Sequence, residues 1–397
     1  MSVTYAGGFR AGGIVAGLKP SGRPDLGLLL GVPGTTTAGL FTTNRVAASP
    51  VRLSLALLSG GHGRGVVVNS GQANAATGAR GDDDAREIIA AAAAAAGVEP
   101  TDLLACSTGV IGEPVHLDRL LAALPELASS LSTDGGEGFA RAIMTTDTVD
   151  KQATADAGPF HVGGCAKGVG MIAPHLATML VFVTTDADVD RDSLQRLADE
   201  QLRPRFNALT VDACPSTNDT VLLFASGVAD APPVSVGSLT WDLLSAAVSE
   251  VGASLVGQLA ADAEGATHVL LIDVAGADSE EDARIVARAV AESPLVKTAA
   301  FGGDPNPGRI LQAVGSSDVD VDPAAIDVAI GGITLATAGT IAPAYFDDDA
   351  NAQAARVAMK EPEIHIQVTL GDGPGRSRAV GCDLSYEYVR INGEYTT

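Results

Sequence analysis

The spacing of hydrophobic residues changes repeatedly along the chain between the pattern of strands and that of helices. Short unbroken apolar runs are typical of buried strands, and they lie at 66–68, 178–184, 221–224 and 268–274. Apolar residues three and four positions apart are typical of helices, and they lie at 82–97, 117–131, 136–145, 190–201, 240–262 and 279–292. This mixture predicts an α/β or α+β fold and excludes an all-α one.

Turn-forming residues divide the remaining chain. Residues 1–60 are short apolar runs broken by Gly and Pro, which predicts strands and turns. Near the end, 364–370 alternates like a half-exposed strand, and Gly371–Gly373 predicts a hairpin to a second strand at 379–391. Three aspartates at 82–84 are expected to cap the helix that they open. The segment 231–233, Ala-Pro-Pro, is the best candidate for a domain boundary.

Composition and charge exclude several classes of function. The chain has 397 residues, 46% of them apolar, which suffices for one large domain or two. Its formal net charge of -23 disfavours binding to nucleic acid and to anionic membranes. The four cysteines form no CxxC and the six histidines form no HExxH, so we expect no metal site. No signal peptide or transmembrane helix is predicted, and a reducing, cytoplasmic location is expected.

One stretch, 166–186, carries the strongest chemical signal. It holds a glycine-rich turn with Lys167, a bend at Pro174, and then Thr178 at the start of an apolar run. Thr178 is either an ordinary first residue of a strand or, after a cut before it, a nucleophile activated by its own α-amine. The same stretch contains Gly168–Ala173, formally G-x-G-x-x-A, but Pro174 follows at once and excludes the helix that a dinucleotide site needs.

The segment Lys167-Gly168-x-Gly170-Met171-Ile172-x-Pro174-x-x-Ala177-Thr178-Met179-Leu180 resembles the self-cleavage motif of the ornithine acetyltransferases, also called glutamate N-acetyltransferases. Further matches to that family occur in the family's order and run almost from end to end. They are 41–45 (FTTNR), 67–71 (VVNSG), 107–112 (STGVIG), 144–148 (MTTDT), 217–220 (TNDT), 264–267 (EGAT), 303–311 (GDPNPGRIL) and 391–395 (INGEY).

The resemblance implies a layered α/β sandwich of the ornithine acetyltransferase (DmpA/ArgJ-like) type. In that family the chain cuts itself between Ala177 and Thr178, so an alpha chain of residues 1–177 and a beta chain of 178–397 share one core. The implied reaction moves acetyl from N2-acetylornithine to glutamate by a ping-pong route through acetyl-Thr178. The implied assembly is an α2β2 heterotetramer, and the implied partners are small amino acids.

The resemblance also assigns residues. Thr108 and Gly109 follow a strand-like run and match the pair that stabilises the oxyanion. The residues that match substrate contacts are Thr145, Lys167, Thr178, Glu264, Asn392 and Thr397. No cofactor is expected, and acetyl-CoA as a co-substrate is left open.

Three departures from the family pattern leave the substrate range open: Gln72, His268 and Pro307. The alternative function is an amidase or aminopeptidase with the same N-terminal nucleophile, in which water takes the acyl group. A third hypothesis is a non-catalytic acidic scaffold, which the set of Thr108, Lys167 and Thr178 disfavours.

Overall fold

The computed structural model describes residues 2–173, 179–346 and 350–394, and it divides into two compact units. The first unit contains residues 2–207 and 214–259, and the second contains 208–213 and 260–394. The boundary predicted at 231–233 is therefore wrong, because that segment lies inside the first unit. The first unit has residues on both sides of position 178.

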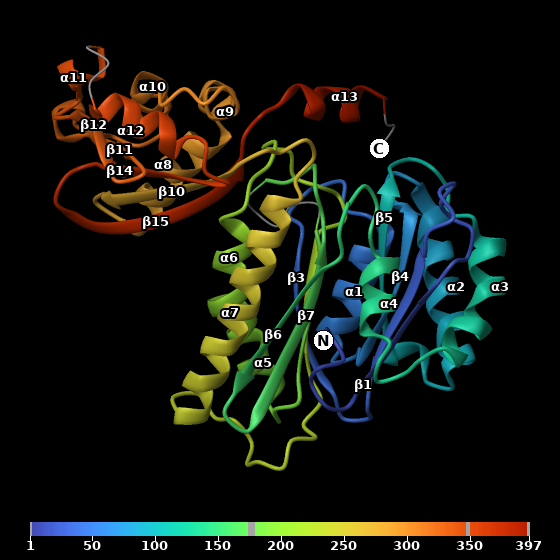
Figure 1. Cartoon of the computed structure of the whole chain (residues 1–397). Coiled ribbons are helices and arrows are strands. Elements are labelled where there is room, and N and C mark those ends of the chain that lie inside the picture. Colours follow the sequence, from blue (N-terminus) through green and yellow to red (C-terminus); the bar gives the residue numbers. More distant parts are fainter. Residues whose placement is uncertain (1, 174–178, 347–349, 395–397) are drawn as a thin grey trace. The chain divides into compact units, whose positions relative to one another are not determined.

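The first unit contains a four-stranded sheet in the order β1-β2-β4-β5. Its strands are β1 (Phe9–Ile14), β2 (Leu26–Gly31), β4 (Gly65–Gln72) and β5 (Leu103–Val110). Only β4 and β5 run parallel, and the other two pairs are antiparallel. Helices α2 (Gly78–Ala96) and α3 (Leu117–Ser129) pack on one face of this sheet (Figure 1). Gly97, with φ 69°, ends α2 in the left-handed conformation that glycine adopts without strain.

A second, five-stranded sheet of the same unit has the order β3-β9-β8-β7-β6. Its strands are β3 (Thr36–Phe41), β6 (Lys151–Ala157), β7 (Phe160–Lys167), β8 (Leu180–Thr185) and β9 (Thr220–Ala225). β8 and β9 follow position 178, whereas β3, β6 and β7 precede it. The two segments on either side of that position thus form one hydrogen-bonded sheet, with β8 antiparallel to β7 and parallel to β9.

The two sheets enclose the main core of the first unit. Phe139, on α4 (Gly136–Ala142), packs edge-on against Phe182 of β8 with ring centroids 5.2 Å apart. Phe9 of β1 makes a similar contact with Phe224 of β9. On the far side of the second sheet lie α5 (Arg191–Leu197) and α7 (Leu239–Ala261) (Figure 1). Helices therefore cover two stacked sheets, which confirms the expected layered α/β sandwich.

Helix α7 has the length and composition of a membrane-crossing helix. Its apolar residues Leu244, Val251 and Leu255 are nevertheless buried. A side chain added at Gly164, on β7, would contact Val251 and Leu255 within 3.2 Å. The apolar side of α7 is thus packed against the second sheet, as in the core helix of a folded domain.

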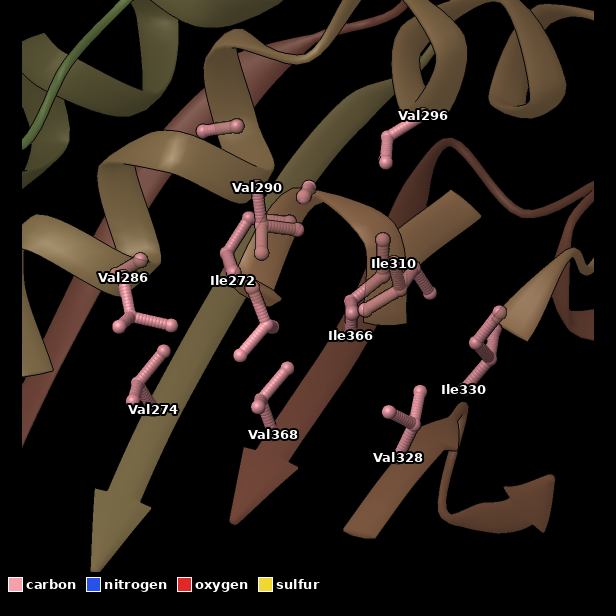
Figure 2. Close-up of a cluster of buried hydrophobic side chains, with 14 of the residues drawn as sticks. Ile272, Val274, Val286, Val290, Val296, Ile310, Val328, Ile330, Ile366 and Val368 are labelled. Atoms are coloured by element: carbon pink, nitrogen blue, oxygen red, sulfur yellow. The ribbon is translucent and has the colours of Figure 1, made fainter. Parts of the chain in front are cut away.

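The second unit is built on a mixed sheet in the order β13-β12-β11-β14-β10-β15. The strands are β10 (Val269–Gly276), β11 (Asp327–Ile330), β12 (Ile333–Thr337), β13 (Thr340–Ile341), β14 (Glu363–Thr369) and β15 (Gly373–Cys382). Helix α8 (Glu280–Glu292) begins at Ser279, whose hydroxyl accepts the Asp282 N–H. Figure 2 shows Val286 and Val290 of this helix facing Ile272 and Val274 of β10. Alternating inward residues of the sheet and one helix face thus make this core.

The remaining helices are α1 (Ser49–Ser59), α6 (Arg203–Asn207), α9 (Pro294–Phe301), α10 (Pro307–Gly315), α11 (Pro343–Phe346), α12 (Ala350–Ala358), α13 (Tyr386–Glu394) and three short helical segments, Pro100–Asp102, Ala198–Leu202 and Pro323–Ala325.

Three sequence-based expectations are wrong. The hairpin at 371–373 does not form, because β10 lies between β14 and β15 and pairs with both. The predicted strand at 379–391 ends at Cys382, and residues 386–394 form helix α13. Aspartates 82–84 do not cap α2, which already begins at Gly78, a full turn earlier.

Candidate active site

The predicted oxyanion pair lies at the carboxyl end of β5. Thr108 is 2% exposed, and Gly109 adopts a φ of 130°. A side chain at position 109 would approach the Gly71 carbonyl oxygen of the neighbouring β4 to 2.2 Å. Only glycine fits there, because both the backbone conformation and the close approach exclude a Cβ atom.

Lys167 brings three of the predicted residues together. It is the last residue of β7 rather than part of a turn, as the sequence suggested, and it is 2% exposed. Its Nζ donates to the Thr108 hydroxyl at 3.1 Å and to the Thr145 hydroxyl at 2.8 Å. A strand end of one sheet is thereby linked to a strand end of the other. Residues from the family motifs at 107–112 and 144–148 thus meet Lys167, the first residue of the motif at 167–180.

Asp147 is a further member of this cluster, and no role for it was expected from the sequence. Its carboxylate accepts the N–H groups of Thr145 at 2.9 Å and Gly168 at 2.8 Å, and pairs with Lys151 at 2.8 Å. Burial by itself raises the pKa of Asp147, but the ammonium groups of Lys167 and Lys151 outweigh it and lower the pKa to about 2. Asp147 therefore stays charged at neutral pH.

A third lysine joins the cluster from the loop between β1 and β2. The buried Asp25 carboxylate orders this loop by accepting the N–H groups of Ala16, Leu18 and Lys19. Lys19 Nζ donates to the Met144 carbonyl at 2.9 Å. Burial lowers the pKa of Lys19 to about 8, opposed by Asp25 and reinforced by Lys167. Three of the chain's five lysines thus gather around Asp147 in a strongly acidic protein.

Two adjacent residues just before β9 connect β5 with β8, and the sequence analysis assigned neither a role. Asn218 donates to the carbonyl oxygens of Ser107 at 2.7 Å and Ala73 at 2.6 Å. Asp219 Oδ1 accepts the Met179 N–H at 3.2 Å. Their only sequence signal was the short motif Thr217–Thr220, which by itself indicates a polar turn.

In the second unit the structure brings together two other predicted residues. Glu264 follows α7, and Asn392 lies on α13. The Asn392 side-chain amide donates to the Glu264 carboxylate at 2.8 Å. Two family motifs that are more than a hundred residues apart, 264–267 and 391–395, therefore meet through these side chains.

Ala177, Thr178 and Thr397 lie outside the described residues, as does His175. Residues 168–173 form no helix.

Comparisons with known proteins identify the family of the chain. The ArgJ family profile matches residues 10–397. The chain belongs to the ArgJ family. The arginine biosynthesis bifunctional protein ArgJ of Parasynechococcus marenigrum is 45% identical over 401 residues, covering 100% of this chain and 95% of that protein. The Thermus thermophilus protein of the same name is 42% identical over 398 residues, with both chains fully covered.

A solved relative has the same name. The crystal structure of an arginine biosynthesis bifunctional protein ArgJ from Bacillus halodurans is 38% identical, with a TM-score of 0.51. The match covers 54% of this chain and 98% of that one. The resemblance found in the motifs is thereby confirmed, and the chain is an acyltransferase of the ornithine acetyltransferase family.

Proposed function

We propose that this protein transfers acetyl from N2-acetylornithine to glutamate through an acetyl ester on Thr178, after it has cut itself between Ala177 and Thr178. The observation that carries the proposal is the buried contact of Lys167 with the Thr108 hydroxyl, beside Gly109. The names of the relatives, which refer to arginine biosynthesis, support the choice of substrates.

The contact with Lys167 leaves the Thr108 hydroxyl able to donate a hydrogen bond to an oxyanion. A hydroxyl has one donor and two acceptor positions. Since the Thr108 oxygen accepts from an ammonium group, its own proton is left to donate, and hydrogen bonds in series strengthen one another. The Thr108 O–H and the Gly109 N–H are therefore the two donors that we assign to the developing oxyanion.

The proposed reaction balances in two halves. The free α-amine of Thr178, with a reference pKa of roughly 8, takes the proton of its own hydroxyl. The Thr178 oxygen attacks the acetyl carbonyl, and the amine of ornithine leaves with that proton. Acetyl-Thr178 remains. The amine of glutamate then attacks the ester and loses a proton, N-acetylglutamate leaves, and the Thr178 hydroxyl is restored.

Charge on the described residues fits the proposed substrates. Lys167 and Lys19 offer positive charge to a carboxylate, as both N2-acetylornithine and glutamate require. Glu264 offers a carboxylate to an ammonium group, and Asn392 offers an amide, as substrate contacts in the second unit. We assign substrate binding to these residues, to Thr145 and to Thr397.

Two observations support self-cleavage. The segments before and after position 178 share one sheet, so the two products of a cut stay joined by the hydrogen bonds between β7 and β8. The solved relative from Bacillus halodurans is matched over 98% of its length by 54% of this chain, about 214 residues. A cut before Thr178 leaves a second chain of similar length, about 220 residues.

The test is an intact-mass spectrum recorded before and after addition of N2-acetylornithine. The expected result is two chains, ending at Ala177 and beginning at Thr178, of which the second gains one acetyl group. Thr178→Ala should give one uncut chain and no acetylation. Two chains in that variant, or acetylation of the first chain, would contradict the proposal.

We further propose an α2β2 assembly in the cytoplasm, with acetyl-CoA as a second acetyl donor to glutamate. Light scattering on the cleaved protein measures the assembly, and replacing N2-acetylornithine by acetyl-CoA in the assay tests the donor. The alternative function, an amidase or aminopeptidase, predicts release of free acetate or amino acid at the same rate with and without glutamate.

A further inference from the structure

The motif Thr217–Thr220 joins the two sides of the catalytic cluster. On one side, Asn218 donates to the carbonyl of Ser107, the residue before Thr108. On the other side, Asp219 accepts the amide N–H of Met179, the residue after Thr178. Asn218 and Asp219 are buried, at 5% and 0% exposure. Two consecutive residues therefore contact the neighbours of the proposed oxyanion donor and of the proposed nucleophile.

The backbone of Met179 is held at both its amide and its carbonyl. Its N–H donates to Asp219, and its carbonyl accepts the N–H of Thr220 at 3.1 Å. Both partners come from the same short segment at the start of β9. The backbone position at the beginning of β8 is thus determined by residues 219 and 220.

The Asp219 carboxyl group is unusual among the buried acids of the first unit. No lysine or arginine pairs with it among the described salt bridges, and Oδ2 is buried without a hydrogen-bond partner among the described residues. Asp147, by contrast, pairs with Lys151. Burial raises the pKa of Asp219 well above its ordinary value, and hydrogen bonds such as that from Met179 oppose the rise only in part.

We propose that Asp219 is a positioning residue for acyl transfer: its carboxyl oxygen holds the Met179 amide, and through the peptide bond it fixes the nucleophile relative to the Thr108–Gly109 pair. This inference rests on the proposed function of Thr178. Asp219 acts as a hydrogen-bond acceptor and transfers no proton. A displacement of about 1 Å at a reacting group can lower a rate by about a hundredfold.

The test compares Asp219→Ala with Asp219→Asn. Asparagine keeps a carbonyl oxygen for the Met179 N–H but carries no titrating proton, whereas alanine keeps neither. We expect Asp219→Ala to lower kcat for acetyl transfer by about a hundredfold with KM changed less than about threefold. Asp219→Asn should stay within about fivefold of the wild type. Rates are expressed per cleaved molecule, counted by intact mass.

Asp186 provides the matched control. It is a buried aspartate just beyond the opposite end of β8, and its carboxylate accepts the N–H of His161 at 2.8 Å. Asp186→Ala and Asp186→Asn should lower the melting temperature and leave kcat within about threefold. A general loss of fold on removing a buried aspartate would lower kcat in both pairs of variants.

Amide hydrogen exchange of the Met179 N–H, followed by NMR, tests the same contact without any activity. Asp219→Ala should speed exchange there by at least about tenfold, and Asp219→Asn should leave it close to the wild type. If the wild type forms no acetyl-Thr178, the proposed function fails while this measurement still decides the contact. Equal kcat in Asp219→Ala and the wild type would overturn the inference. An Asp219→Asn variant as slow as the alanine variant would also overturn it, because a proton of Asp219 would then be needed.

Discussion

Replacing Asp147 by asparagine tests whether one carboxylate holds the lysine cluster in place. Asp147 is 1% exposed, and the ammonium groups of Lys151 and Lys167 lie 2.8 and 4.0 Å from its oxygens. Both lysines are themselves at most 2% exposed. Asparagine has nearly the same shape but no charge, so the variant removes the carboxylate that faces two buried ammonium groups.

Two routes give the magnitude. Removing one partner of a buried ion pair costs about 3–5 kcal/mol of stability. Independently, a pKa of about 2 against the ordinary 3.8 corresponds to about 2 kcal/mol in favour of the folded carboxylate. The second value is a lower limit, because the pKa already includes the unfavourable effect of burial. We therefore expect Asp147→Asn to lower the free energy of unfolding by at least about 2 kcal/mol, with about 3–5 kcal/mol as the expected value.

The sign of the pH dependence follows from the lowered pKa. Asp147 contributes its stability above the unfolded-state pKa, and this contribution is lost as the pH falls from about 4 through about 2. The difference in stability between the wild type and Asp147→Asn should therefore be full at pH 7 and smaller by about 1 kcal/mol near pH 3.

Thermal unfolding at both pH values is the assay. At pH 7 we expect the melting temperature to fall by at least about 4 °C, and by about 6–10 °C for a loss of 3–5 kcal/mol, from about 2 °C per kcal/mol for a domain of this size. Asp199→Asn is the control, because Asp199 makes an exposed ion pair with Arg203 at 2.6 Å that contributes at most about 1 kcal/mol. A loss below about 1 kcal/mol in Asp147→Asn, or the same loss in both variants, would refute the reasoning.

Two further predictions concern activity. Thr108→Ala should lower kcat by roughly ten- to a thousandfold with little change in KM, because one oxyanion donor is lost; steady-state kinetics measure this, and a raised KM with unchanged kcat would make Thr108 a substrate contact. Removing residues 393–397 should leave self-cleavage on a denaturing gel nearly intact and abolish transfer to glutamate, at about 1–3 kcal/mol for each lost hydrogen bond to the substrate; full transfer activity would exclude the tail from the site. Asn392→Ala separates the loss of its contact with Glu264 from the loss of the last residues, and it should raise KM more than it lowers kcat.

The local pattern was sufficient to predict most elements. Continuous apolar runs predicted β4, β8 and β9, because a strand buried on both faces needs no polar position, and also β10, whose alternate residues are only half-buried. Helical spacing predicted α2, α3, α7 and α8, and it did so without knowledge of any partner element. The spaced family motifs likewise predicted the family and the layered fold, as the comparisons confirmed.

The local spacing of apolar residues did not predict which distant strands pair. The glycine turn at 371–373 has the composition of a hairpin, yet β10, about a hundred residues earlier, separates β14 from β15. The turn sequence favours a hairpin through only a few local residues. Placing β10 between β14 and β15 instead forms backbone hydrogen bonds along two whole strands. Helix α13 replaced the expected strand at 379–391 for a related reason: β15 ends at Cys382, so the chain beyond it has no neighbouring strand on which to continue.

The sequence by itself determined which residues belong to the candidate site, since Thr108, Thr145 and Lys167 were all chosen from motifs. Only the tertiary structure decided that they touch, through Lys167 Nζ, and that Asp147 and Asp219 belong beside them. The charge state of the two aspartates depends on the same fold. Both are buried, but Asp147 pairs with two lysines from β6 and β7, while Asp219 accepts the backbone amide of Met179, the residue just before β8. The motifs at 144–148 and 217–220 each contain an aspartate among polar residues, and the sequence gives no sign that the two pKa values differ. The groups that set each pKa come from strands distant in sequence.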